Sequence, residues 1–200
     1  MLWTLIPAKS FRHSKQRLAP VLDEEQRAAL SAAMLARTIR TAKAAFGDQP
    51  LIVVTPDHAV SQLALEAGAD RAIIAEAEGL NPQLAEAAAL IPPDDALLVL
   101  HADLPLLQPD DLVALASQNA PIVIAPDHTG TGTNALLQRI PDRFFAFGAG
   151  SRAKHEREAS ERGVDPVCIR REGLACDLDD PGDWNRLGLP VAALLDRLTR

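Results

Sequence analysis

The stretch Ala96-Leu-Leu-Val-Leu-His-Ala-Asp-Leu-Pro-Leu-Leu107 decides how this sequence folds. Its apolar run lies between Pro92-Pro93 and Pro105, and predicts a fully buried strand in the middle of a parallel sheet. Asp103 follows that strand, at the edge where open α/β sheets bind ligands. A carboxylate there is suited to hold a metal ion against a polyphosphate. The same residue could instead start a turn or cap the helix predicted near Pro109.

Strands and helices alternate on both sides of this stretch. Further apolar runs predict strands at 2–6, 51–55, 72–75, 122–125, 135–138 and 167–170, and a strand-like segment that Asp177 and Asp179 follow. Periodic segments predict helices at 23–46, 57–68, 80–91, 109–119 and 151–163, the first capped by Asp23 and the last by Ser151. The order predicts an α/β fold with a mostly parallel mixed central sheet, flanked by helices on both faces.

Length and composition predict one domain over residues 1–200, because nearly half of the residues are apolar. No apolar run is long enough for a bilayer span, and the chain enters a strand without a charged leader, so we expect a cytoplasmic protein that does not bind membranes. Cys168 and Cys176 lack the spacing of a zinc site or disulfide framework. The net charge of −7 argues against a nucleic-acid partner and favours a small molecule.

Positive charge is nevertheless concentrated at the start of the chain. Residues 1–22 contain Lys9, Arg12, Lys15 and Arg17 and no acidic residue. Cations gathered in a loop at the carboxyl edge of the sheet could surround a triphosphate, although such a loop could also simply be solvated. Neither G-x-G-x-x-G nor a P-loop motif follows the first strand, which excludes the dinucleotide-binding and P-loop classes.

Two later segments are also suited to anions. The loop Thr129-Gly-Thr-Gly-Thr133 can offer backbone N–H groups and hydroxyls to a phosphate or carboxylate, but Gly-Thr pairs also occur in plain turns. Arg152 and Lys154 fall in the first turn of a predicted helix, where the helix dipole disfavours cations. A bound anion would remove that penalty, and so would side chains that bend away.

Acidic residues near the C-terminus supply a second possible metal ligand. Asp177 could share a Mg²⁺ ion with Asp103, and Asp179 is the less favoured choice, because Asp179 or Asp180 could cap a helix starting at Pro181. His101 adjoins the strand end, but a histidine there is more often packed in the core than used as a base.

Six segments together resemble a known family, the guanylyltransferases of coenzyme F420 biosynthesis. This family includes 2-phospho-L-lactate guanylyltransferase and phosphoenolpyruvate-using relatives. The resemblance spans nearly the whole chain. It rests on Ile6-Pro-Ala-Lys-Ser-Phe-Arg-His-Ser-Lys-Gln-Arg-Leu-Ala-Pro20, Gly79-Leu-Asn81, Ala102-Asp-Leu-Pro-Leu106, Gly130-Thr-Gly-Thr-Asn-Ala-Leu136, Phe145-Ala-Phe-Gly-Ala-Gly-Ser151 and Gly173-Leu-Ala-Cys-Asp-Leu-Asp179.

The resemblance implies a Rossmann-like nucleotidyltransferase fold of the GT-A type. It further implies transfer of GMP from GTP to a small phosphorylated acid: phosphoenolpyruvate, 2-phospho-L-lactate or 3-phospho-D-glycerate. By this similarity Asp103 and Asp177 would carry Mg²⁺, with Lys15 and Asp103 as the catalytic pair. The triphosphate would be held by Lys9, Lys15 and Arg17, the guanosine would lie near Asn81, and the acceptor would bind Thr133, Gly148 and Ser151. Pro82 stands where the family usually has a small residue, which weakens the assignment of Asn81.

Other functions remain compatible with the residues. A nucleotidyltransferase with another acceptor is the nearest rival, although a molybdopterin enzyme would carry a Gly-Gly loop after the first strand. A glycosyltransferase would carry Asp-x-Asp where Asp103 stands alone. An inactive nucleotide-binding protein is the alternative from another class. A homo-oligomer and contact with a downstream F420 transferase are both compatible with the enzyme interpretation.

Overall fold

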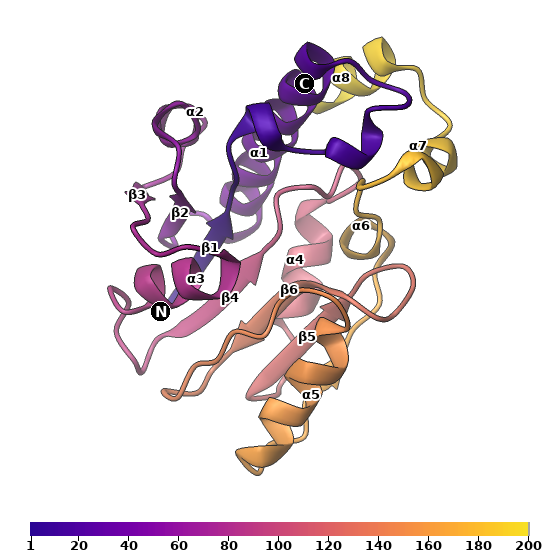
Figure 1. The fold of residues 1–200 in the computed structure, drawn as a ribbon. Helices are drawn as coiled ribbons and strands as arrows, with labels where there is room; N and C mark the ends of the chain where they lie inside the picture. Colours follow the sequence, from indigo (N-terminus) through magenta and orange to yellow (C-terminus); the bar gives the residue numbers. More distant parts are fainter. Residues whose placement is uncertain (200) are drawn as a thin grey trace.

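One seven-stranded sheet runs through the molecule in the order β3-β2-β1-β4-β6-β5-β7 (Figure 1). The structure is a computed structural model that describes residues 1–199. Only β6 runs antiparallel to its neighbours β4 and β5, and the other pairs are parallel. The predicted mostly parallel mixed sheet is therefore confirmed. The strands are β1 (Leu2–Pro7), β2 (Leu51–Thr55), β3 (Arg71–Ile74), β4 (Ala96–Leu100), β5 (Ile122–Pro126), β6 (Thr133–Gln138) and β7 (Val167–Cys168).

Helices connect the strands and close the chain. Two short 3₁₀ helices, η1 (Phe11–His13) and η2 (Gln16–Leu18), lie in the loop after β1. Within residues 1–199 no helix is both long and apolar enough to cross a membrane. The α-helices are α1 (Glu24–Phe46), α2 (His58–Glu66), α3 (Leu80–Ala88), α4 (Pro109–Ala116), α5 (Ser151–Glu161), α6 (Glu172–Ala175), α7 (Pro181–Leu187) and α8 (Val191–Thr199).

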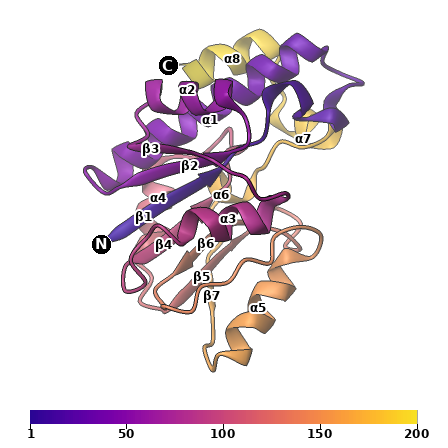
Figure 2. The same ribbon diagram turned by 60° about the vertical axis from the view of Figure 1, so that its left-hand side comes forward.

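The helices form a layer on each face of the sheet (Figure 2). Successive strand residues point to opposite faces, so Ile6 packs with α1, α2 and α4 whereas Leu5 packs with α3 and α5. Strand β4 supplies both layers in the same way, with Leu98 on the first face and Val99 on the second. Burial on both faces explains why the central strands read as continuous apolar runs.

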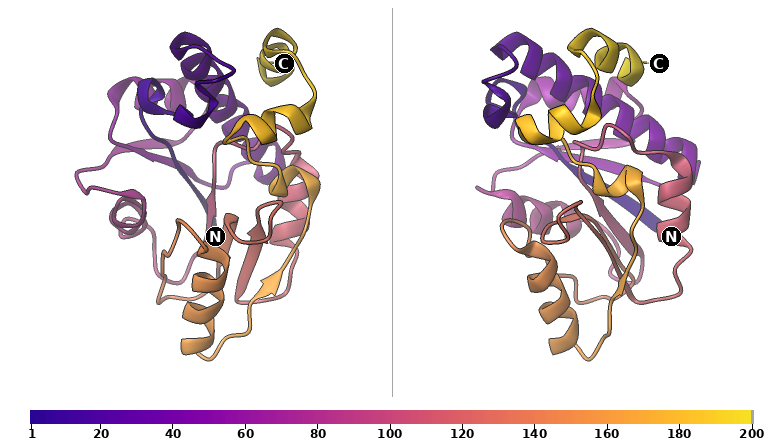
Figure 3. Two further views of the ribbon diagram at one scale, coloured as in Figure 1. Left: turned by 45° about the vertical axis from the view of Figure 1, so that its right-hand side comes forward. Right: turned by 90° about the vertical axis from the view of Figure 1, so that its right-hand side faces the viewer.

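A smaller apolar cluster lies beyond the main sheet, where the C-terminal segment packs on α1 and on the loop after β1, and Figure 3 shows α8 beside α1. Helix α8 packs on α1 there, close to the loop after β1. The cluster joins segments far apart in sequence, and its buried members are Leu18, Leu22, Leu30, Met34, Leu178, Leu194 and Leu198. It thereby fixes the β1 loop against the segment that follows α6.

The structure corrects several predicted boundaries. Helix α3 ends at Ala88 instead of running to Pro92, and Arg143 donates to the carbonyls of Ala88 and Ile91 at 3.3 and 3.1 Å. The strand predicted at 167–170 has only two residues in the sheet. Ser151 is the first residue of α5, and its predicted capping role falls to Gly150, which adopts φ 65°.

The segment before Asp177 is the larger correction. It is the short helix α6, where a strand-like segment was expected. Gly173 in this helix packs directly on the side chain of Asp111 in α4 and on the carbonyl of Leu106. A Cβ would not fit between these groups, so glycine lets α6 approach α4 this closely.

Candidate functional site

Lys15 is held at the centre of the candidate site. It is the one described non-glycine residue with a positive φ, 51°, a conformation that costs an L-residue about 1–2 kcal/mol. Its Nζ donates to Asp103 Oδ2 at 2.6 Å and to Asp179 Oδ1 at 2.7 Å. Burial of neighbouring Leu18 and these two ion pairs hold the strained turn in place. The site therefore has a cation fixed between two carboxylates.

The electrostatics of Lys15 and Asp103 match that geometry. Burial alone would lower the pKa of Lys15, but Asp103 and Asp179 together raise it above its ordinary value. Burial opposes ionisation of Asp103, yet the attraction of Lys15, assisted by His101, lowers the Asp103 pKa to about 2. Both groups are charged at neutral pH, as charge stabilisation of a polyphosphate requires.

Asp103 also has an oxygen that nothing in the described chain satisfies. Its Oδ1 is buried and has no hydrogen-bond partner, whereas Oδ2 is bound by Lys15. A buried carboxylate oxygen without a partner is costly, and such groups commonly face a bound ion or water. This oxygen is free to bind a cation.

Asp177 lies next to Asp103, but neighbouring groups compensate its negative charge less than that of Asp103. Burial raises its pKa first, and repulsion by Asp103 raises it further, while the amide of Asn134 at 3.3 Å opposes the shift. A backbone hydrogen bond also joins the segments that contain Asp103 and Asp177, because Leu178 N–H donates to the Asp103 carbonyl at 3.1 Å. Two adjacent carboxylates that repel each other would be stabilised by a shared divalent cation.

The donor set fits Mg²⁺ only as a partial shell. Among the residues whose side chains the structure describes, 1–199 without His13, no group of three His, Cys, Asp or Glu side chains is placed to hold a metal. Mg²⁺ commonly takes one or two protein carboxylates and completes its shell with water and substrate phosphates. Asp103 and Asp177 match that pattern, and the metal assignment stays a prediction.

The short segment around Asp177 and Asp179 is positioned by several polar contacts. Asn134 in β6 donates to the carbonyl of Leu174 at 2.9 Å, which fixes α6 to the sheet. Asp180 caps α7 by accepting from Gly182 N–H at 2.7 Å, and this leaves Asp179 free to reach Lys15. Asp180 is thus the N-cap of α7, and it is one of the two residues predicted for this role.

We expect Gly173→Ala to destabilise the fold by about 3 kcal/mol or more, as overpacking at a tight contact does. A Cβ at Gly173 would overlap the Asp111 carboxylate and lie 2.9 Å from the Leu106 carbonyl oxygen. Urea unfolding measures the loss. In an Asp111→Ala background one obstacle is gone, so the same methyl group should cost less. Equal costs in the two backgrounds would contradict this packing account.

The three predicted acceptor contacts lie on neighbouring elements. Thr133 begins β6, Ser151 begins α5, and Gly148 lies in the loop before α5 with φ 120°. Ser151 N–H donates to the Gly148 carbonyl at 3.0 Å, and Thr133 Oγ1 lies 3.0 Å from His155 Nδ1. The structure thus links Thr133 to α5 through a histidine that the sequence did not single out.

Asn81 binds the backbone of Phe147 through both ends of its side-chain amide. Its Nδ2 donates to the Phe147 carbonyl at 3.1 Å, and its Oδ1 accepts from Phe147 N–H at 2.8 Å. Both ends of the amide are therefore engaged by the loop that contains Gly148. A contribution of Asn81 to nucleotide binding would act mainly through the position of this loop.

The remaining predicted cations lie at the surface. Lys9 and Arg17 are exposed, and neither forms an ion pair with any residue from 1 to 199. The backbone N–H groups of Asp183 and Gly182 lower the pKa of the Asp180 carboxyl, and Arg17 adds a smaller effect in the same direction. The structure brings only Lys15 into contact with Asp103, so roles for Lys9 and Arg17 in triphosphate binding stay predictions.

The Gly-Thr loop is folded onto a carboxylate. Asp127 Oδ1 accepts from Thr131 N–H at 2.9 Å, and the Asp127 carbonyl accepts from Gly130 N–H at 3.1 Å. These bonds use N–H groups that an anion would need, and they add a negative charge. Arg152 donates to the Gly130 carbonyl at 3.3 Å and to Glu156 at 2.8 Å, so its place in the first turn of α5 needs no bound anion.

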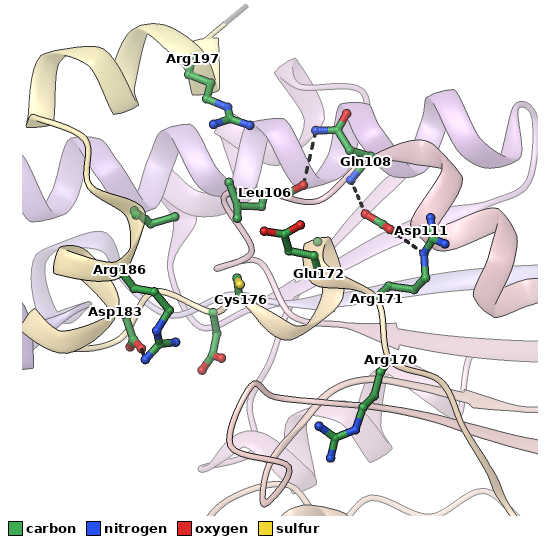
Figure 4. Close-up of a pocket in the computed structure, with 13 residues that line it drawn as sticks. Leu106, Gln108, Asp111, Arg170, Arg171, Glu172, Cys176, Asp183, Arg186 and Arg197 are labelled. Atoms are coloured by element: carbon green, nitrogen blue, oxygen red, sulfur yellow. Dashed lines mark hydrogen bonds and ion pairs between the residues drawn. The ribbon is translucent and has the colours of Figure 1, made fainter.

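A cavity of about 760 Å³ adjoins the site along α6 and α7 (Figure 4). It shares Asp177 with the candidate metal site. Two of its four arginines form ion pairs within the lining: Arg171 contacts Asp111 at 2.9 Å and Arg186 contacts Asp183 at 3.4 Å. The cavity is lined by Leu106, Gln108, Asp111, Arg170, Arg171, Glu172, Gly173, Cys176, Asp177, Asp183, Arg186, Leu187 and Arg197.

Comparison with known sequences assigns the chain to a family. The family "Guanylyl transferase CofC like" matches residues 2–189. This chain belongs to that family. It is 41% identical to a phosphoenolpyruvate guanylyltransferase of Rubrobacter xylanophilus over 192 residues, which cover 93% of each chain. It is 38% identical to the enzyme of the same name from Roseiflexus castenholzii over 183 residues, 91% of this chain and 85% of that one.

Solved structures show the same fold at low sequence identity. A nucleotidyl transferase from Methanothermobacter has a TM-score of 0.66 at 17% identity and covers 98% of both chains. A cytidylyltransferase from Leptospira borgpetersenii has a TM-score of 0.61 at 13% identity, with 98% of this chain and 92% of that chain covered. The nucleotidyltransferase fold and the membership in the guanylyl transferase family are thus both confirmed.

We expect the stability of this CofC-like protein to fall between pH 6.5 and pH 4 because of His155. Burial lowers the His155 pKa to about 4, helped by His101 and, more weakly, by Lys154, while Glu158 opposes the shift. The unfolded histidine takes up its proton near pH 6.5, so the stabilisation is complete above that pH and is lost as the pH falls towards 4. The loss is on the order of 3 kcal/mol.

Urea unfolding at pH 7 and pH 4.5 tests this expectation. The difference between the two pH values should shrink in His155→Gln. It should persist in His58→Gln, which replaces an exposed histidine on α2. An equal pH dependence in wild type and His155→Gln would contradict the assignment to His155.

Proposed function

We propose that this protein transfers GMP from GTP to a small phosphorylated three-carbon acid and releases pyrophosphate, as a step in coenzyme F420 biosynthesis. Phosphoenolpyruvate is the first acceptor to test, since both relatives described above are named for it. The observation that carries the proposal is the buried, unpartnered Oδ1 of Asp103 beside Asp177 and Lys15. Within a guanylyl transferase family, this is the arrangement expected where a nucleotide triphosphate reacts.

The chemistry is an in-line attack of an acceptor phosphate oxygen on the α-phosphorus of GTP. The new P–O bond forms as the bond from the α-phosphorus to the bridging oxygen breaks, and pyrophosphate leaves with that electron pair. The acceptor phosphate is already ionised at neutral pH, so no general base is needed. Positioning and charge neutralisation then supply most of the rate enhancement.

The residues of this chain divide those tasks. Asp103 and Asp177 would hold Mg²⁺, which when bound neutralises charge on the phosphates. Lys15 supplies a fixed positive charge beside Asp103, and its two ion pairs keep Nζ in place. Lys9 and Arg17 are exposed at the same loop and would bind the triphosphate from its outer side.

The acceptor would bind on the other side of Asp103. Thr133, Gly148 and Ser151 would contact it, because they lie on adjacent elements and offer a hydroxyl, a backbone amide and a second hydroxyl. Asn81 would set the guanosine side of the site by holding Phe147. These roles rest on the family resemblance and on the proximity of the residues.

A pyrophosphate-release assay tests the proposal directly. Wild-type protein is incubated with Mg²⁺, one of GTP, ATP or CTP, and one of phosphoenolpyruvate, 2-phospho-L-lactate or 3-phospho-D-glycerate. We expect turnover with GTP and a phosphorylated acid, highest with phosphoenolpyruvate, and a product whose mass equals the acid plus GMP less water. Chelation of the metal should stop turnover, and added Mg²⁺ should restore it. Binding of GTP without turnover on any acceptor would favour a nucleotide-binding protein instead.

A further inference from the structure

His155 is a buried polar residue that the reaction itself does not use. It has 0% exposure and lies in α5, one turn after Ser151. Its ring contacts β6 through Thr133 and the preceding loop through Ala146. It therefore touches each of the three elements that contain the predicted acceptor contacts.

The hydrogen bonds define which nitrogen of His155 bears the proton. The Ala146 N–H group donates to Nε2 at 3.2 Å, so Nε2 must present a lone pair. The imidazole is neutral at pH 7, because burial lowers its pKa to about 4. Its single proton is then on Nδ1, which donates to Thr133 Oγ1 at 3.0 Å.

This assignment sets the direction of the Thr133 hydroxyl. Its oxygen accepts from His155, so its own proton must point elsewhere, and no other residue among 1–199 hydrogen-bonds to Oγ1. Thr133 is only 2% exposed, so its hydroxyl keeps a donor that no described protein group takes up. Donors recognise the oxygens of carboxylates and phosphates, and such bonds to charged groups are stronger than neutral ones.

The same histidine also fixes the loop that contains Gly148. The ring of Phe147 meets His155 edge to face with centroids 4.6 Å apart, and its centroid lies 5.1 Å from that of His101. Asn81 holds the main chain of Phe147 through two hydrogen bonds. His101 follows β4 two residues before Asp103, so the stack links the acceptor loop to the strand of the metal site.

We propose that His155 is a positioning residue for the acceptor. In its Nδ1–H tautomer it holds the 146–150 loop against β6 and keeps the Thr133 hydroxyl as a donor toward an anionic oxygen of the acid. The inference rests on the proposed function for the identity of the acid. It predicts that the site favours an acid that places a carboxylate or phosphate oxygen, and not a hydroxyl group, against Thr133.

The first test is the tautomer itself. Long-range ¹H–¹⁵N spectra of histidine-labelled wild-type protein at pH 7 distinguish the two neutral forms and the cation. The proposal expects a protonated Nδ1 and an unprotonated Nε2 for His155. A protonated Nε2 would overturn it, whatever the enzyme's activity.

The second test is a double-mutant cycle on ligand affinity. Binding of phosphoenolpyruvate in the presence of Mg²⁺ is measured by calorimetry for wild type, Thr133→Val, His155→Gln and the double variant. Glutamine can still accept from Ala146 N–H but is placed less well to reach Thr133. Each single change should weaken binding about tenfold, the typical worth of one hydrogen bond to a charged group.

The double variant decides whether the two residues act together. It should bind no more weakly than Thr133→Val, because the histidine acts on the ligand through the threonine. GTP affinity should fall less than phosphoenolpyruvate affinity, whereas a merely structural role would weaken the binding of both ligands equally. Additive losses, or equal losses for both ligands, would overturn the proposal, as would a wild-type protein that does not bind phosphoenolpyruvate. Binding that shows the predicted coupling without turnover would contradict only the proposed function.

Discussion

Asp103→Asn should abolish guanylyl transfer, with kcat reduced by about a thousandfold or more while the fold is retained. Asparagine keeps the size of the side chain and an oxygen that can accept from Lys15. It removes the negative charge and with it the capacity of the buried Oδ1 to bind a cation. Steady-state pyrophosphate release gives the rate, and circular dichroism with urea unfolding shows whether the fold is intact.

Asp95→Asn provides the matched control at the other end of the same strand. Asp95 binds the N-terminal amine at 2.7 Å and Trp3 Nε1 at 2.9 Å, away from Asp103. This variant should turn over normally. The role assigned to Asp103 is wrong if its asparagine variant keeps wild-type kcat, or if both variants lose activity together.

Lys15→Met should lower kcat by about a hundredfold and destabilise the protein by about 2 kcal/mol. Methionine fills much of the space of the lysine stem but leaves Asp103 and Asp179 without their common cation. The side chain of Lys15 is only 9% exposed, so water replaces the lost charge poorly. The neighbouring carboxylates of Asp103, Asp177 and Asp179 would then repel one another, which destabilises the folded state and weakens triphosphate binding.

Lys43→Met is the control for losing a lysine ion pair elsewhere. Lys43 binds Asp70 at 2.6 Å on the surface, where such pairs contribute less than about 1 kcal/mol. We expect normal turnover and a small loss of stability. Lys15→Arg should retain part of the activity because the charge remains. A Lys15→Met variant as active as Lys43→Met would show that the buried cation is dispensable.

The sheet could be predicted because its signal is local. Apolar runs such as 51–55 and 96–100 coincide with β2 and β4, and Asp23 caps α1 through its bond to Gln26 N–H at 2.8 Å. Each of these features depends on neighbouring residues alone. The weaker predictions, such as the strand-like segment before Asp177, involve contacts with distant residues.

The site was only partly accessible from sequence for the same reason. The position of Asp103 at the end of β4 follows from the strand order, and the choice of Lys15 and Asp177 as its neighbours came from the family pattern. The contact of Asp179 with Lys15 depends on a left-handed turn that no local pattern indicates. His155 lies in a polar helix, and nothing in its sequence neighbourhood marks it as buried. One local signal was available: Asp180-Pro-Gly-Asp183 is a capping pattern, which would have left Asp179 free.

Helix α8 has a consequence for how the protein can be handled. The family match ends at residue 189, so this helix lies outside the matched part. Its Leu194 and Leu198 nevertheless pack on Leu18 and Leu178, which neighbour Lys15 and Asp177. Helix α8 therefore holds in place the two segments that contain Lys15 and Asp177. Deletions or fusions at this terminus should therefore impair catalysis, although α8 contains none of the proposed reacting groups.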